Sequence, residues 1–184
     1  MDFFEVSYSD ETNPVALGTS IPTGAWDCHM HFYDKEDIGK ISPVGLVMPP
    51  ATLDDYRQVR DHMGTTNVVA VQSVAYGFNN DLMLECMSEF EGVARGVVVL
   101  PPDVGKDTIT ELSSRGVCGA RAFMLDGSIM DWSDLSIIGQ TIEPFGWHLQ
   151  VQLDGRSLPE HFEFLNSIPC PLVIEHNGKY LKPV

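Results

Sequence analysis

Short runs of apolar residues alternate along the chain with longer segments in which apolar residues recur at helical spacing. The run at 68–71, Val-Val-Ala-Val, is continuous, as expected for a strand that is covered on both faces. Similar runs recur along the chain, bounded by glycine, proline or polar residues. The pattern predicts six strands, at about 24–31, 68–71, 96–100, 117–123, 147–153 and 172–174.

The segments between these runs predict five helices. The first has clear end signals, because Thr52 suits the N-cap, Asp55 lies three residues further on, and Gly64 suits the C-terminal end. Its expected apolar stripe is Leu53, Tyr56, Val59 and Met63. The other helices are expected after an Asn80 cap, over 107–115, between a Ser133 cap and Gly146, and after a Ser157 cap with Pro159 in the first turn.

Strands that alternate with helices favour a parallel α/β sheet with right-handed crossovers. One candidate is an open doubly wound sheet, which often has a glycine-rich phosphate turn after strand one, where this chain has Cys-His-Met-His. The other is a (β/α)8 TIM barrel truncated after strand six, with polar residues at the carboxyl ends of its strands. Such residues here are His29, His31, Gln72, Arg121, Gln152 and His176. They favour the barrel, although a complete barrel takes ~250 residues.

The domain organisation expected from this pattern is simple. Residues 1–20 are polar and irregular and predict a leader without a core of its own, and residues 21–184 predict one partial barrel domain. The long segment at 32–51 is rich in proline and glycine and has the length of a functional loop.

The charge of the chain narrows the class of partner. With 26 acidic and 11 basic residues the net charge is −15, which argues against binding to nucleic acid or to anionic membranes. The sequence shows neither a signal peptide nor an apolar run of membrane-spanning length. Its four cysteines are far apart, which favours reduced thiols and a cytoplasmic protein.

The candidate chemistry begins at the end of the first strand. Asp27, His29 and His31 alternate, so in a regular strand they project from one face. Two imidazoles at a strand end can polarise a carbonyl oxygen or bind a metal.

Six segments, taken in order, resemble the amidohydrolase superfamily, and within it the lactone-acting branch of 2-pyrone-4,6-dicarboxylate lactonase and D-galactarolactone isomerase. They are 27–34, 51–57, 71–77, 119–125, 146–155 and 173–176. The resemblance implies the barrel fold and a lactone of a sugar acid or related carboxylate as substrate. The general-base aspartate of strand eight would fall beyond residue 184. A second family arginine falls on Gly127, which makes a dicarboxylated pyrone a poorer fit.

The resemblance also implies roles for individual residues. His29, His31 and His176 would be catalytic and would surround the lactone carbonyl oxygen. Arg121 would hold a substrate carboxylate, with an ion pair to another strand end as the alternative. The remaining substrate-binding candidates are Gln72, Gln150, Gln152 and Tyr76; for Gln150 a buried core amide is the equal alternative.

We expect no cofactor and no metal; a divalent metal such as zinc is the alternative, with His29, His31 and His176 as its ligands. Two functions of different class remain. One is lactone hydrolysis or isomerisation by carbonyl polarisation. The other is a truncated, non-catalytic remnant of the fold that acts as a binding or assembly partner. The unpaired edges of a partial barrel predict a chain of marginal stability or association into a homo-oligomer.

Overall fold

The computed structural model describes residues 21–43 and 45–180, so the predicted leader at 1–20 lies outside the described residues. The sheet has six strands in the order β1-β2-β3-β4-β5-β6, and all neighbours are parallel. The strands are β1 Trp26–Met30, β2 Asn67–Val71, β3 Val93–Val98, β4 Val117–Phe123, β5 His148–Gln152 and β6 Leu172–Ile174.

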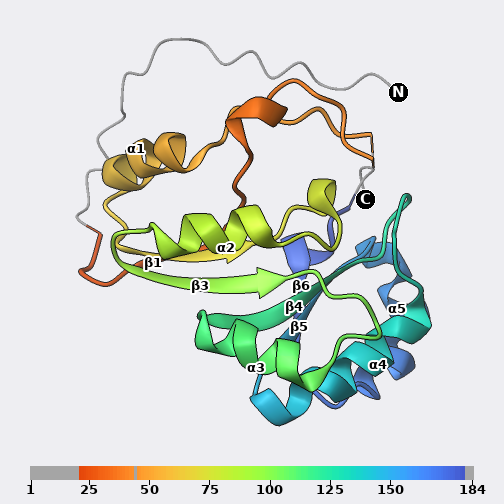
Figure 1. Ribbon diagram of the computed structural model, residues 1–184. Helices are drawn as coiled ribbons and strands as arrows, with labels where there is room; N and C mark the ends of the chain where they lie inside the picture. Colours follow the sequence, from red (N-terminus) through yellow and green to blue (C-terminus); the bar gives the residue numbers. More distant parts are fainter. Residues whose placement is uncertain (1–20, 44, 181–184) are drawn as a thin grey trace.

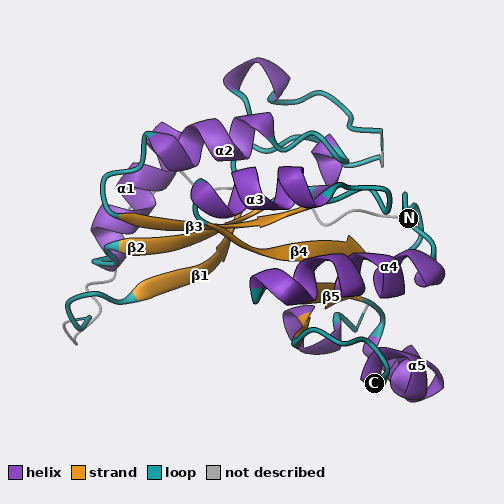
Figure 2. Ribbon diagram, turned by 60° about the horizontal axis from the view of Figure 1, so that its bottom comes forward, coloured by secondary structure: helices purple, strands orange, loops and turns teal. Residues whose placement is uncertain are grey.

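Five helices connect the strands. They are α1 Leu53–Met63, α2 Asp81–Ser88, α3 Lys106–Ser114, α4 Trp132–Ile142 and α5 Leu158–Asn166. Figure 2 shows α1, α2 and α3 along one side of strands β1 to β4. The strands curl into a half-barrel (Figures 1 and 2). The structure therefore confirms the partial barrel, with strands in chain order.

The core lies between the sheet and the helices. Val68 and Leu149 of the sheet and Ile109, Leu135 and Ile138 of the helices are at most 1% exposed. Burial of such side chains supplies the main stabilising free energy, about 1.5–3 kcal/mol for each large aliphatic group. The helices thereby fix the sheet whose carboxyl-end residues form the site.

Helix α1 has the predicted ends. The Asp55 amide donates to Thr52 Oγ1 at 3.3 Å, the Thr52 amide donates to Asp55 Oδ2 at 2.9 Å, and Gly64 ends the helix at φ 79°. The predicted stripe is partly wrong: Leu53 and Tyr56 are buried, but Val59 is 51% exposed.

Asn80 and Ser157 occupy the predicted N-cap positions of α2 and α5, but neither side chain makes a capping hydrogen bond, and the predicted cap at Ser133 is wrong. The Asn80 amide instead binds the Val99 backbone, donating to its carbonyl at 2.9 Å and accepting from its N–H at 3.0 Å. Helix α4 begins after Asp131, whose backbone N–H donates to the Asp134 carboxylate at 2.8 Å. The Ser157 hydroxyl donates back to the Asp154 carbonyl at 2.7 Å. For Asn80 and Ser157, a backbone group outside the helix takes the hydrogen bond of the side chain.

Strand β3 also differs from its prediction, since it begins at Val93 rather than at 96. Its first residues are half-exposed or exposed, so the apolar pattern did not mark them.

Candidate active site

The carboxyl end of β1 contains a β-bulge. The register of β1 against β2 shifts between Asp27 and Met30, so one extra residue enters β1. Asp27 was expected on the same face as the histidines, and this prediction is wrong. Its carboxylate instead accepts the Tyr56 hydroxyl of α1 at 3.1 Å, because the bulge breaks the alternation of side chains.

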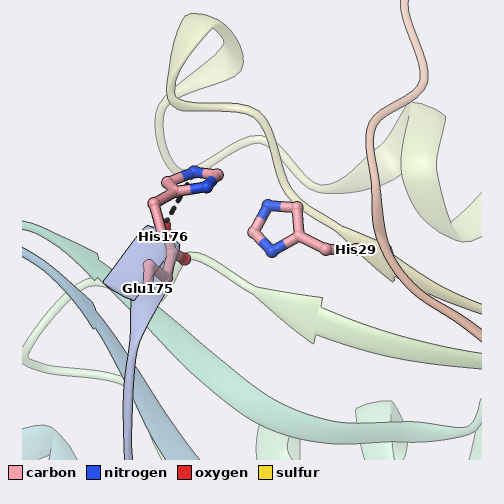
Figure 3. Close-up of side chains that lie close together, drawn as sticks. All are labelled: His29, Glu175 and His176. Atoms are coloured by element: carbon pink, nitrogen blue, oxygen red, sulfur yellow. Dashed lines mark ion pairs between the residues drawn. The ribbon is translucent and has the colours of Figure 1, made fainter. Parts of the chain in front are cut away.

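The three predicted histidines do converge. The ring centroid of His29 lies 5.0 Å from that of His31 and 5.1 Å from that of His176. His176 follows β6 in a short turn where it has φ 50° and Asn177 has φ 52°. This left-handed backbone brings the His176 ring towards His29 (Figure 3). Groups from the first and the last described strand thus meet at one end of the sheet.

His31 is held as a neutral imidazole. Its Nδ1 lies 2.6 Å from the Val71 carbonyl, which only accepts, so the ring proton is on Nδ1. Burial lowers the pKa of His31 to about 4, against the opposing effect of that hydrogen bond. At neutral pH His31 therefore offers a free Nε2 lone pair.

His29 has the opposite hydrogen-bonding role, because its free ring nitrogen carries the proton. Burial lowers the pKa of His29, the Glu175 charge opposes this shift, and the Arg121 charge adds to it. The Gln150 side-chain nitrogen lies 3.5 Å from His29 Nδ1, and in this orientation it donates, which places the ring proton on Nε2. That Nε2 is buried and has no hydrogen-bond partner among the described residues.

Arg121 lies in an ion pair with Glu175. Arg121 Nε donates to Glu175 Oε1 at 2.7 Å and Nη2 donates to Oε2 at 2.8 Å. The two side chains are 3% and 0% exposed. The Arg121 Nη2 also donates to Gln152 Oε1 at 2.7 Å, and Nη1 to the Gln72 carbonyl at 2.8 Å. This bonding matches the alternative of an ion pair with another strand end; the role of Arg121 towards a substrate remains a prediction.

Three of the other four predicted binding residues are hydrogen-bonded to groups other than the histidines. The Gln72 side chain donates to the Asn79 carbonyl, and Gln152 is engaged by Arg121. The Tyr76 hydroxyl donates to Asp37 and accepts from the Asp34 amide at 2.9 Å, so it holds the loop after β1. Gln150 adjoins His29. All four substrate-binding roles remain predictions.

Sequence reasoning missed Glu175. This residue is fully buried, and its Oε2 lies 3.8 Å from His176 Nε2 (Figure 3). The available signal was an acid at the same strand end as His176, but its partner Arg121 is 54 residues away.

One cluster of side chains has ligand atoms close enough together to hold a metal ion. Ligand atoms of His29, Glu175 and His176 all lie within 4.8 Å of one another, whereas the sequence predicted His31 in place of Glu175. The fit is poor, because both Glu175 oxygens already accept from Arg121. A metal would compete with a buried guanidinium for that carboxylate.

A parallel α/β half-barrel with histidines at the carboxyl ends of its strands defines the class of the α/β-barrel proteins. The family model described as "Amidohydrolase" matches residues 26–183, and the chain belongs to this family.

Two curated relatives are similar over most of the chain. D-galactarolactone isomerase of Agrobacterium fabrum is 29% identical over 92% of this chain and 58% of its own length. A 2-pyrone-4,6-dicarboxylate hydrolase of Comamonas testosteroni is 28% identical over 91% of this chain and 56% of its own length. The chain thus spans less than two thirds of these relatives.

Solved structures agree on the fold. An apo crystal structure of an Agrobacterium tumefaciens protein has 29% identity and a TM-score of 0.79 over 90% of this chain and 61% of its own. A second, from Pseudomonas putida, has 23% identity and a TM-score of 0.70 over 83% of this chain and 56% of its own. Within the described residues, none of the helices has the length and apolar character needed to cross a membrane.

Proposed function

We propose that the protein is an amidohydrolase-type enzyme that hydrolyses or isomerises a lactone of a sugar acid or related carboxylate. The observation that carries this proposal is the convergence of His29, His31 and His176 at the carboxyl ends of β1 and β6. The relatives' names, a lactone isomerase and a lactone hydrolase, support the substrate class. A non-catalytic remnant would have no need for two buried polar atoms, His29 Nε2 and Gln150 Oε1, that have no hydrogen-bond partner among the described residues.

The hydrogen-bonding states of the histidines assign complementary roles. His29 donates from Nε2 to the carbonyl oxygen, where negative charge develops, and the His176 ring lies beside the His29 ring. His31 accepts a hydrogen bond at Nε2 from the attacking oxygen, since its own proton is held by Val71.

The reaction balances with these groups. The oxygen of water, or of a substrate hydroxyl in an isomerase, forms a bond to the carbonyl carbon, and the carbonyl electron pair moves to the oxygen near His29. Collapse breaks the bond from this carbon to the ring oxygen. The proton lost by the attacking oxygen is finally taken up by the departing ring oxygen, which leaves as a hydroxyl. In hydrolysis the second proton of the water stays on the new carboxyl group, or passes to solvent when the product is released as a carboxylate.

We propose that this chemistry needs no metal, because Glu175 is committed to Arg121. We also propose a cytoplasmic enzyme without a nucleic-acid or membrane partner, in keeping with its charge of −15.

Replacement of His29 tests the proposal. His29→Asn should lower kcat for a sugar-acid lactone on the order of 10²–10³-fold, the usual loss of one oxyanion donor. The matched control is His62→Asn, because His62 is exposed on α1. Lactone loss is followed by carbon NMR, which separates the free acid from an isomeric lactone. Equal rates for both variants would refute the proposed role.

A further inference from the structure

Among the residues that the structure describes, the site presents one permanent cation near the histidines. Arg121 is the only arginine or lysine among the charges that act most strongly on the pKa values of His29 and His31. A substrate carboxylate at this position would have to be held by Arg121 or by a neutral donor. The state of Arg121 therefore bears on which lactones the site accepts.

The donors of Arg121 are almost fully used. Four of its N–H groups are donated, two to Glu175, one to Gln152 and one to the Gln72 carbonyl. A guanidinium has five. The Nε and Nη2 edge, which makes the bidentate contact with Glu175, is open to a substrate carboxylate only if Glu175 is displaced. That exchange would leave the fully buried Glu175 carboxylate without its counter-charge, which is strongly unfavourable. Any other contact with Arg121 would use its one remaining N–H or displace Gln152 or Gln72, beside a cation that Glu175 already neutralises.

Two of the three neighbouring histidines add no positive charge. Burial lowers the pKa values of His29 and His31, so both are neutral at pH 7. Arg121 and Glu175 together carry no net charge. The field of the whole chain, with a net charge of −15, opposes an anion further.

A polar atom in the site favours a hydroxyl instead. Gln150 Oε1 is buried and has no hydrogen-bond partner among the described residues. It is an acceptor, so a substrate hydroxyl would satisfy it, whereas a carboxylate oxygen would be repelled. Gln150 also adjoins His29, which places this acceptor beside the proposed carbonyl position.

We infer that the site selects a neutral polyhydroxy lactone, of the aldonic-acid type, over a lactone that carries a free carboxylate. In this account Arg121 is a positioning residue that binds Glu175, Gln152 and the end of β2, and Gln150 receives a substrate hydroxyl. The inference rests on the proposed function, because it names the substrate class of that site.

The test compares two lactones of equal ring size, a neutral aldonolactone and an aldarolactone with one free carboxylate. The wild-type protein should have a kcat/KM at least tenfold higher for the neutral lactone. Glu175→Gln removes the competing charge from Arg121, so it should shift the ratio at least tenfold towards the acid lactone. The matched control is Glu163→Gln, which removes one charge from the exposed surface of α5 and should leave the ratio unchanged.

A double variant separates the effect of the Glu175 charge from that of the Arg121 charge. The double variant Arg121→Gln with Glu175→Gln removes both charges and should restore the wild-type preference. If Glu175→Gln does not fold, the wild-type ratio decides alone. A wild-type preference for the acid lactone, or an unchanged ratio in a folded Glu175→Gln variant, would overturn the inference.

If neither lactone reacts, the proposed function fails, and the inference is judged by binding. Calorimetric titration with the aldarate dianion should then show weaker binding than titration with the neutral lactone; tighter binding of the dianion would overturn the selectivity.

Discussion

At the residue scale, the histidines differ in what they offer although they lie together. His31 is fixed as an acceptor by the Val71 carbonyl, and His29 as a donor by Gln150. A sequence pattern of two alternating histidines carries no information on these tautomers. They follow from partners that are 40 and 121 residues away along the chain.

The lowered pKa of His31 predicts a pH dependence of stability. The pKa is about 4 in the folded protein and about 6.5 in the unfolded chain. Between these values the unfolded state binds more protons, so stability rises with pH in this window and is complete above about 6.5. On acidification from pH 7 to pH 4, His31 alone should lower the free energy of unfolding by ~3 kcal/mol.

Urea denaturation at pH 7 and at pH 4 checks this prediction. His31→Asn should reduce the loss on acidification relative to wild type, because it removes the titrating ring. The exposed His62 again supplies the control, and His62→Asn should keep the wild-type pH dependence. A His31→Asn variant with the full wild-type dependence would contradict the buried neutral state of His31.

At the element scale, the apolar periodicity predicted the six strands, and two of them, β4 and β6, have the expected bounds. This succeeded because strands buried on both faces form continuous apolar runs. Side-chain partners were less predictable. The bulge in β1 reoriented Asp27, and the side chain of Asn80, although at the N-cap of α2, bonds to Val99 and not to the helix. Both arrangements depend on strands that are distant in sequence.

The Asn80 contact has a testable contribution to stability. Its side chain bonds to both polar groups of Val99 and so ties the loop before α2 to the chain just after β3. Asn80→Ala should lower the free energy of unfolding by about 1–3 kcal/mol, because it leaves partly buried backbone groups unpaired. Asn166→Ala, at the exposed end of α5, is the control and should change stability by less than about 0.5 kcal/mol. Equal denaturation midpoints for the two variants would show that the Val99 contact is energetically unimportant.

At the scale of the whole molecule, β1 and β6 each have one neighbouring strand within the described residues. Unpaired parallel edges present free backbone groups that can pair with another chain. We therefore predict that the 184-residue chain associates at micromolar concentration. Sedimentation velocity checks this; a stable monomer with a sharp cooperative melt would contradict it.

The arrangement of the site also belongs to this scale. The ordered strand-end residues predicted that His29, His31 and His176 would meet, because parallel strands end at one edge of the sheet. The Arg121–Glu175 pair was not predicted, since it joins β4 to the turn after β6 and depends on the curvature of the sheet. It changes the proposed substrate class from an acid lactone to a neutral one.

The central claim is that His29, with the His176 ring beside it, polarises a lactone carbonyl. Isotope-edited infrared difference spectroscopy of a carbonyl-labelled neutral aldonolactone tests it most directly. Bound to wild-type protein, the carbonyl stretch should move to lower frequency than in solution, and this shift should be largely lost in His29→Asn. A bound lactone whose carbonyl frequency is the same in wild type, in His29→Asn and in water would contradict the account.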